Sequence, residues 1–344
     1  MSRFGFAAIA ILLGSCGTEE AARTIDEWEL FVDPAAQAPS EGVVPYDIVA
    51  PLFSDYASKH RFLRVPEGEQ ITVDETGRWQ FPVGTVLVKT FAFPYDLRDL
   101  SLGERIIETR LLVLEEDGWR PFVYVWNDDV TEAVLAPAGR RVPVEFIDAS
   151  GTNVSLTYRV PSHTQCGNCH GGTADIIPLG PRTGQLDRDH DYGAGPENQI
   201  DHLVALGWLA ARPGPSPDFV DPFDPESTDV DAQARSYIDA NCAHCHREGG
   251  SAEQSGLWLG IETEAGSVRL GICKPPVATG PRGSGGRAQV ISPGAPDDSI
   301  FVYRMESDEP GVKMPEEPTL LVHREGAELM RRWIVAMPPR DCSM

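Results

Sequence analysis

Apolar and polar residues alternate along the middle of the chain in the way that β-strands require. The clearest case is 153–160, where an apolar side chain at every second position predicts one buried and one solvated face. Further segments rich in β-branched and aromatic residues predict strands at 85–93, 108–114, 119–126 and 142–147. Asp117 and Gly118 predict a hairpin turn between two of them. We therefore expect an antiparallel β-sandwich within a β-rich domain at 51–160.

Helical spacing of apolar residues appears later in the chain. Residues 200–209 predict one helix, in a segment at 161–212 that shows no strand alternation. Several prolines between 213 and 228 can continue neither helix nor strand, and they predict a linker. Thr228 is the expected N-cap of the next helix, and a last helix is predicted over 323–336.

The beginning of the chain carries the pattern of an export signal. One arginine, about ten apolar residues and a few small ones fit a secretory signal peptide at 1–15, too short to cross a bilayer. The sequence Leu-Gly-Ser-Cys that ends at Cys16 resembles a bacterial lipobox, which predicts cleavage before Cys16 and a lipid on its thiol. An ordinary signal peptide is the alternative. Residues 16–50, rich in Ala, Pro and Glu, are expected to form a loose tether. The expected location is the periplasm or the outer membrane, with membrane association through the lipid.

The composition limits the classes of partner. The chain has 344 residues, a formal charge of -23 and 41% apolar residues, which is enough for two folded domains. An acidic surface repels phosphate backbones, so we expect no nucleic-acid partner.

Two copies of the motif C-x-x-C-H carry the chemistry. They consist of Cys166, Cys169 and His170, and of Cys242, Cys245 and His246. Two thiols at this spacing reach the two vinyl groups of one haem as thioethers, and the next histidine ligates the iron. We therefore expect two covalently bound haem c groups. A zinc site built from two C-x-x-C pairs and a thioredoxin-like redox pair are the alternatives.

Two further cysteines, Cys273 and Cys342, are left over. In an oxidising compartment they are expected to form a disulfide that fixes the C-terminal tail, and two free thiols are the alternative.

Residues 228–340 resemble a class I cytochrome c domain, because a helix leads into Cys242, a Met314-Pro315 pair follows and an amphipathic helix closes the chain. The resemblance implies that Met314 is the second axial ligand of the haem at 242–246. Met305 is a weaker alternative, because the gap from His246 to Met314 is longer than in a minimal cytochrome c.

Nearly the whole chain after residue 40 resembles bacterial dihaem c-type cytochromes with a β-rich domain before the haem sites. The resembling strings are Val44-Pro45-Tyr46-Asp47, Pro51-Leu52-Phe53-Ser54-Asp55-Tyr56, Asn198-Gln199 and Pro293-Gly294. The expected fold class is α+β: an antiparallel β-sandwich-like domain with a first haem-binding segment at 161–212, then a linker at 213–228. A small, mainly α-helical cytochrome c domain with the second haem is expected at 229–344.

The second axial ligand of the first haem stays open, because no methionine occurs between Met1 and Met305. Candidates are His202, in the helical patch, a methionine from the other domain, or no ligand. Further candidates among the histidines are His190, His163 and His60. A histidine ligand would give this haem a lower potential than a His/Met partner.

The expected function is one-electron transfer between redox partner proteins. The rival is a dihaem enzyme, a peroxidase or a dehydrogenase subunit, with an open or displaceable site at the first haem. A third reading, a structural lipoprotein that uses haem only for folding, predicts redox-silent behaviour.

Overall fold

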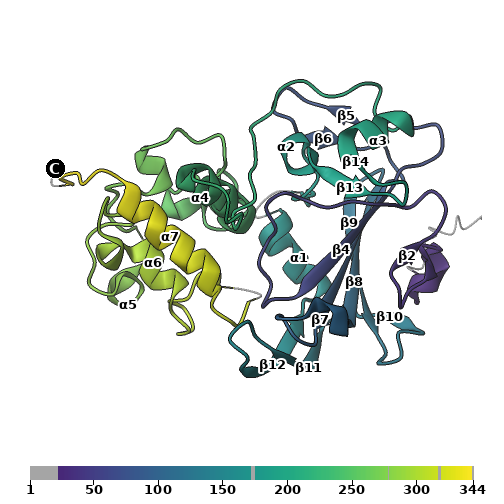
Figure 1. Ribbon diagram of the computed structural model, residues 1–344, viewed down its shortest axis with the longest axis horizontal. Helices are drawn as coiled ribbons and strands as arrows, with labels where there is room; N and C mark the ends of the chain where they lie inside the picture. Colours follow the sequence, from purple (N-terminus) through teal and green to yellow (C-terminus); the bar gives the residue numbers. More distant parts are fainter. Residues whose placement is uncertain (1–21, 172–174, 278, 317–318, 343–344) are drawn as a thin grey trace, which may run out of the picture.

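The computed structural model describes residues 22–171, 175–277, 279–316 and 319–342. The expected signal peptide and Cys16 lie outside these residues. Within the described part the protein is a mixed α+β fold, with antiparallel strands in the N-terminal half and helices in the C-terminal half, as predicted (Figure 1). None of the helices in this part is both long and apolar enough to cross a membrane.

One antiparallel sheet forms the framework of the N-terminal half. Among the described residues it has six strands in the order β10-β9-β8-β7-β4-β3. They are β3 (Val44–Pro45), β4 (Ser58–Arg64), β7 (Val86–Pro94), β8 (Glu104–Glu115), β9 (Gly118–Trp126) and β10 (Ala133–Leu135). Glu115 pairs with Gly118, so the turn between β8 and β9 consists of Glu116 and Asp117, one residue earlier than predicted.

A hairpin of β11 (Arg140–Ile147) and β12 (Asn153–Val160) packs against one face of this sheet. The alternation predicted for β12 is confirmed, because its polar side chains are exposed while Tyr158 and Val160 are buried. The expected β-sandwich is only partial in the described chain: its second layer is this single hairpin. Helix α1 (His163–His170) lies beside this hairpin (Figure 1). Residues of the hairpin and of α1 line a large cavity.

The opposite face of the sheet is covered by the segment that was expected to be a tether. Ile25, Leu30 and Val43 are buried against the sheet, and β3 in this segment is its edge strand. The tether prediction is therefore wrong for 22–50. Isolated apolar residues between prolines are enough to cover a sheet, although they show no helical or strand period. Two short strands, β1 (Phe31–Asp33) and β2 (Ala38–Pro39), and a 3-10 turn at Ile25–Trp28 complete it.

A small subdomain packs at one end of the sheet, where the predicted helix at 200–209 is found as α3 (Gln199–Ala205). Its other elements are β5 (Thr72–Val73), β6 (Trp79–Gln80), α2 (Thr183–Leu186), β13 (Asp189–Asp191) and β14 (Pro196–Asn198). The predicted linker, 213–228, contains neither helix nor strand.

The C-terminal half is helical. Its elements are α4 (Val230–Ile238), a π-helical turn η3 (Asp239–Ala243), α5 (Gly280–Ser284), α6 (Ile300–Met305) and α7 (Arg324–Ala336), with 3-10 turns at Glu253–Ser255, Val268–Leu270 and Pro296–Asp298. The N-cap of α4 is Asp229 rather than Thr228, since the Asp229 carboxylate accepts a hydrogen bond from Ala232 N. Helix α7 buries the face that carries Ala327, Met330, Trp333 and Ile334, and α4 packs against this helix.

The segment 51–56 ties the two halves together. Phe53 N donates to Asn241 Oδ1 at 2.7 Å, one residue before the second motif. The buried Asp55 carboxylate accepts hydrogen bonds at 2.7 Å from the amides of Leu320 and Leu321. Tyr56 donates its hydroxyl proton to Glu325 at 2.9 Å. The position of the second motif is therefore fixed from the N-terminal half.

Candidate functional site

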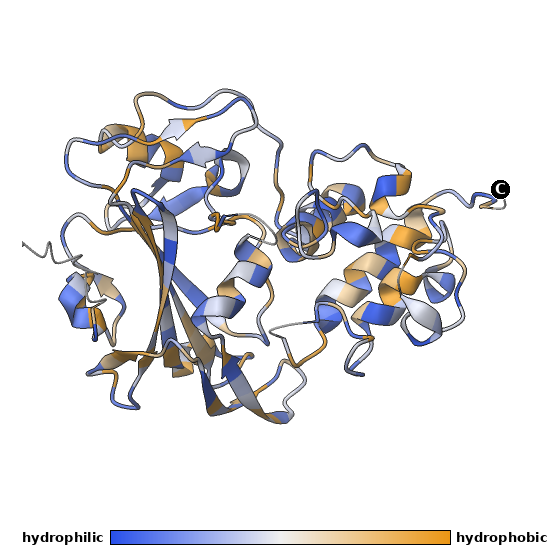
Figure 2. Cartoon of the chain, turned by 180° about the vertical axis from the view of Figure 1, so that it is seen from behind, coloured by the Kyte–Doolittle hydropathy of each residue, from blue (hydrophilic) through white to orange (hydrophobic). Residues whose placement is uncertain are grey.

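The first motif lies entirely on helix α1. Positions i, i+3 and i+4 share one face of a helix, so Cys166, Cys169 and His170 point to the same side. Ser162 and Gln165 form a capping box that starts the helix. Figure 1 shows α1 between the sheet and the C-terminal helices, yet none of its residues is buried, and Figure 2 colours it mostly hydrophilic or neutral. An interior helix without buried side chains faces space rather than a packed core.

The second motif follows α4 and the π-helical turn η3. The amides of Cys245 and His246 donate to Cys242 O at 3.2 and 2.9 Å, so the motif continues as a helical turn. The Asp239 carboxylate accepts a hydrogen bond from Ile261 N at 2.8 Å and pairs with Arg182 at 3.2 Å. These bonds fix the turn from the C-terminal half and from the N-terminal half.

The structure brings the two motifs together. The ligand atoms of Cys169, His244 and Cys245 all lie within 4.8 Å of one another. Cys245 Sγ also lies 3.9 Å from Asn168 O, although the two residues are 77 positions apart in sequence. The sequence predicts each motif from its spacing but not the contact between the two motifs, and His244, between Cys242 and Cys245, stands at a variable position of the motif.

A cavity of about 1020 Å³ opens beside this contact, between the sheet, α1 and η3. It matches the upper end of the volumes of about 300–1,000 Å³ found for ligand sites. Counted over the described residues, nine arginines and lysines and three carboxylates line it, in a chain with a net charge of -23. The lining is therefore strongly cationic, which suits a ligand with several acidic groups.

Both motif histidines are held as neutral imidazoles. His170 Nδ1 lies 2.9 Å from Ile177 O, and because a carbonyl only accepts, this nitrogen carries the proton and Nε2 keeps its lone pair. His246 Nδ1 lies 2.9 Å from Ser255 Oγ. Burial lowers the pKa of each imidazole to about 4. An imidazole fixed through Nδ1 is oriented to ligate a metal through Nε2.

Three of the four motif thiols are held protonated. Burial raises the pKa of the Cys166 thiol, and it raises that of Cys242 to about 12. The hydrogen bond between Cys169 and Cys245 raises the pKa of Cys169 and lowers the pKa of Cys245. Cys166 also packs on the core between the sheet and the β11–β12 hairpin.

The loop that contains Met314 runs near the second motif. Met314 N donates to Arg304 O at 2.9 Å, and the charge of Arg304 acts on the His246 imidazole. Met314 is half-buried and does not line the large cavity. Met305, the weaker alternative ligand, is buried in the helical core.

His202 is not brought to either motif. Its Nδ1 lies 2.6 Å from Glu197 Oε1, and its ring stacks on Tyr192 with 3.6 Å between centroids. These contacts hold the ring beside α3, away from the cavity, so His202 is not carried into the ligand set proposed below. Among the described residues, the cavity lining also lacks the other three histidines that were weighed: His190, His163 and His60.

The remaining cysteines form the predicted disulfide. Cys273 and Cys342 are bonded, with 5.0 Å between their Cα atoms. The bond fixes the C-terminal tail to the helical half, and neither cysteine lines the large cavity.

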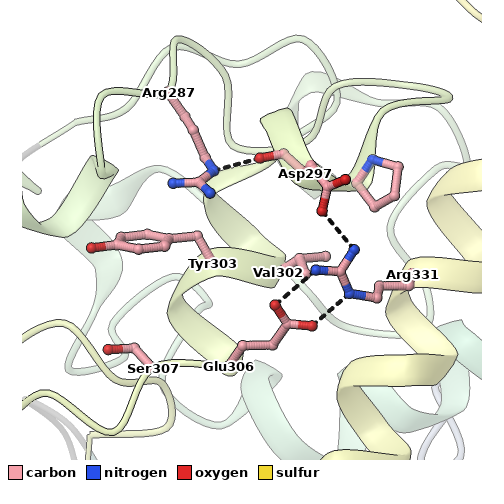
Figure 3. A pocket seen from close by; sticks show the side chains of 8 residues that line it. Arg287, Asp297, Val302, Tyr303, Glu306, Ser307 and Arg331 are labelled. Carbon is pink, nitrogen blue, oxygen red and sulfur yellow. Dashed lines mark hydrogen bonds and ion pairs between the residues drawn. The ribbon is translucent and has the colours of Figure 1, made fainter.

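A second, smaller cavity of about 150 Å³ lies between α6 and α7 (Figure 3). Its charged groups are already paired: Arg331 binds Glu306 at 2.5 and 2.8 Å and Asp297 at 2.8 Å. Arg287 donates to Asp297 O at 2.7 Å. This cavity offers no free group comparable to the motif histidines.

Comparison of the chain with protein-family models, with curated proteins and with solved structures finds no match, so its function is argued from the site itself.

Proposed function

We propose that this chain is an exported dihaem c-type cytochrome that transfers single electrons between redox partner proteins. The observation that carries the proposal is the contact between two C-x-x-C-H motifs from distant parts of the sequence at one cationic cavity. Bound haem supplies a one-electron iron couple. The contact of Cys169 with Cys245 supports a relay, because two cofactors attached there would have neighbouring edges.

The chemistry of the described cavity residues fits a haem. The cavity has the volume of a large ligand site, an arginine whose Nη2 atom is buried without a partner, Arg61, and an apolar floor that includes Phe91. The proposed attachment residues are Cys166, Cys169, Cys242 and Cys245. The proposed proximal ligands are His170 and His246, whose Nδ1 atoms are already engaged. Met314 is the proposed distal ligand at the second site, which makes 229–344 the cytochrome c domain.

The first test is the haem stoichiometry of the purified full-length protein, read as the pyridine haemochrome. We expect two haems per chain, one in Cys169→Ser/His170→Ala and one in Cys245→Ser/His246→Ala. Cys342→Ser, at a cysteine outside the cavity, is the matched control and should keep two. Met314→Ala should remove the weak far-red absorption band of Met-ligated ferric haem. A wild-type chain without haem contradicts the proposal.

A haem enzyme is the second candidate. The observation in its favour is that none of the four histidines weighed as distal ligands reaches the cavity within the described chain. An enzyme requires a high-spin first haem that binds carbon monoxide or peroxide, whereas two low-spin haems favour the relay. Cys169, His244 and Cys245 also make a zinc-like cluster. Metal analysis of the purified protein distinguishes this zinc-site hypothesis from the cytochrome proposal, because a zinc site predicts bound zinc and a cytochrome predicts bound iron.

The proposed location is the periplasm or the outer membrane, with the mature chain anchored by a lipid on Cys16. The Cys273–Cys342 disulfide supports export, because structural disulfides persist in oxidising compartments. Mass spectrometry of the mature N-terminus should find acylated Cys16, and Cys16→Ser should move the protein from the membrane fraction to the soluble fraction. If the wild-type protein is already in the soluble fraction, the lipid anchor is contradicted and the signal peptide is an ordinary one.

A further inference from the structure

Three cations lie side by side across the sheet at the large cavity. Arg61 on β4 pairs in register with Lys89 on β7, and Lys89 pairs with Arg110 on β8. All three line the cavity. Like charges directly opposite one another destabilise a sheet. A negatively charged group bound beside this cationic row, Arg61–Lys89–Arg110, would remove that repulsion.

Carboxylates of the protein neutralise only part of the charge of this row. Arg110 forms an ion pair with the buried Glu108. Arg61 is 7% exposed and lies 3.7 Å from Asp47, but its Nη2 is buried without a hydrogen-bond partner. The Lys89 side-chain nitrogen has no hydrogen bond or ion pair to any described residue and lies 5.1 Å from the centre of the Phe91 ring. Burial, together with the charges of Arg61 and Arg110, lowers the pKa of Lys89 well below the ordinary value of a lysine, so its ammonium form lacks a stabilising anion. Arg61 and Lys89 are therefore the two members of the row whose positive charge is not fully neutralised by described residues.

The row has a direction relative to the first motif. At one end, the charge of Arg110 acts on the thiols of Cys166 and Cys169. Arg61, at the other end, is two strand spacings away, about 10 Å. In haem, the vinyl groups that form thioethers and the propionate groups lie on opposite edges of the macrocycle. A haem attached at the Arg110 end thus directs its propionates toward the Arg61 end.

We propose that the cationic row is a carboxylate-binding site and that Arg61 and Lys89 hold the propionate groups of the first haem. This inference rests on the proposed function, since it needs haem on Cys166 and Cys169. It assigns a role to residues on two separate strands, β4 and β7, that have no place in the C-x-x-C-H motif. Charge-assisted hydrogen bonds from Arg61 Nη2 and Lys89 Nζ to carboxylates would satisfy the groups that the fold leaves without partners.

The test is a redox titration of the full-length dihaem protein over a range of pH values. Arg61→Gln and Lys89→Gln should keep two haems and lower the potential of one haem only, because loss of a nearby cation favours the oxidised iron. The propionate pKa, read from the pH at which the slope of potential against pH changes, should rise, because a propionate without its cation holds its proton more tightly. Arg61→Lys and Lys89→Arg should restore most of both properties. The matched control is Arg120→Gln on β9, an arginine paired with Glu115 outside the cavity lining.

The outcomes separate the inference from the function beneath it. Two haems with unchanged potentials and pH profiles in both Gln variants overturn the inference and leave the cytochrome proposal standing. A high-spin haem in Lys89→Gln also overturns it, because Lys89 would then be an iron ligand. If the Gln variants fail to mature, Arg61→Lys and Lys89→Arg decide: two haems with near-wild-type pH profiles support the inference, and failure of both charge-conserving variants to mature overturns it. A wild-type chain without haem removes the proposed function itself.

Discussion

Replacing Asn241 with alanine should loosen the connection between the second motif and the N-terminal half. Asn241 Oδ1 accepts from Phe53 N at 2.7 Å, and its Nδ2 donates to Tyr237 O at 3.0 Å and Pro51 O at 3.3 Å. In Asn241→Ala the buried Phe53 N–H loses this acceptor, which costs about 1–3 kcal/mol. The two carbonyls keep a second lone pair, so their loss adds about 1 kcal/mol together. The expected cost is about 2–4 kcal/mol.

Hydrogen exchange of the full-length protein measures this cost locally. A loss of about 2 kcal/mol raises the opening equilibrium of the segment 51–56 about 30-fold, and its amides should exchange faster by that factor. Asn127→Ala is the matched control, because the Asn127 amide bonds only Thr131 and Glu132 in an exposed loop. Unchanged exchange at 51–56 in Asn241→Ala would refute the reasoning that this side chain couples the two halves.

Three further substitutions test the packing. In Gly326→Ala the new Cβ would overlap the hydroxyl and Cζ of the buried Tyr237, and this clash should outweigh the gain in helix propensity. Urea unfolding should show a loss of about 1–3 kcal/mol in the free energy of unfolding. In a Tyr237→Leu background the same substitution should cost nothing, because the overlapping atoms are absent. Cys342→Ser opens a link between residues 69 apart and should cost up to about 4 kcal/mol; a thermal midpoint equal to that of the oxidised wild type contradicts this. Burial lowers the pKa of His323 from 6.5 to about 4, so folding favours the neutral ring, and up to about 3 kcal/mol of stability should be lost as the pH falls from 6.5 to 4. His323→Phe should flatten unfolding curves in that range, and an unchanged slope there would assign the loss to other groups.

Local patterns were enough to predict most of the secondary structure and the individual motifs. The alternation at 153–160 matches β12 residue for residue, and the last helix begins one residue later than expected. The tether failed because Ile25 and Leu30 have no periodic neighbours, and their burial depends on a sheet face formed elsewhere in the chain. The sandwich is only partial for a related reason, because a strand pattern shows that one face of a strand is buried without showing what covers that face.

The candidate site depended even more on tertiary contacts. The spacing within each C-x-x-C-H motif is local, but the contact of Cys169 with Cys245 depends on how the two halves dock. That docking is made by 51–56, one of the strings that carried the family resemblance. Two further strings, 44–47 and 198–199, act in the same way, since Asp47 and Gln199 exchange hydrogen bonds at 2.6 and 3.0 Å. The resembling strings thus mark contacts between distant segments.

The distribution of charge connects the cavity to the rest of the molecule. The cavity lining contributes nine cations and three carboxylates, a net charge of +6, and removing this from the total of -23 leaves -29 for the remaining residues. A chain this acidic gains nothing in solubility from gathering cations in one interior cavity, and the row on β4, β7 and β8 has a cost in the folded sheet. Such an arrangement is stable when an anionic group occupies the cavity, and under the proposed function the acidic remainder of the chain would favour a redox partner with a basic docking surface. Cofactor and partner would then be selected by opposite charges in two separate regions, and high salt should weaken partner docking far more than cofactor retention, because buried charges are screened less than exposed ones.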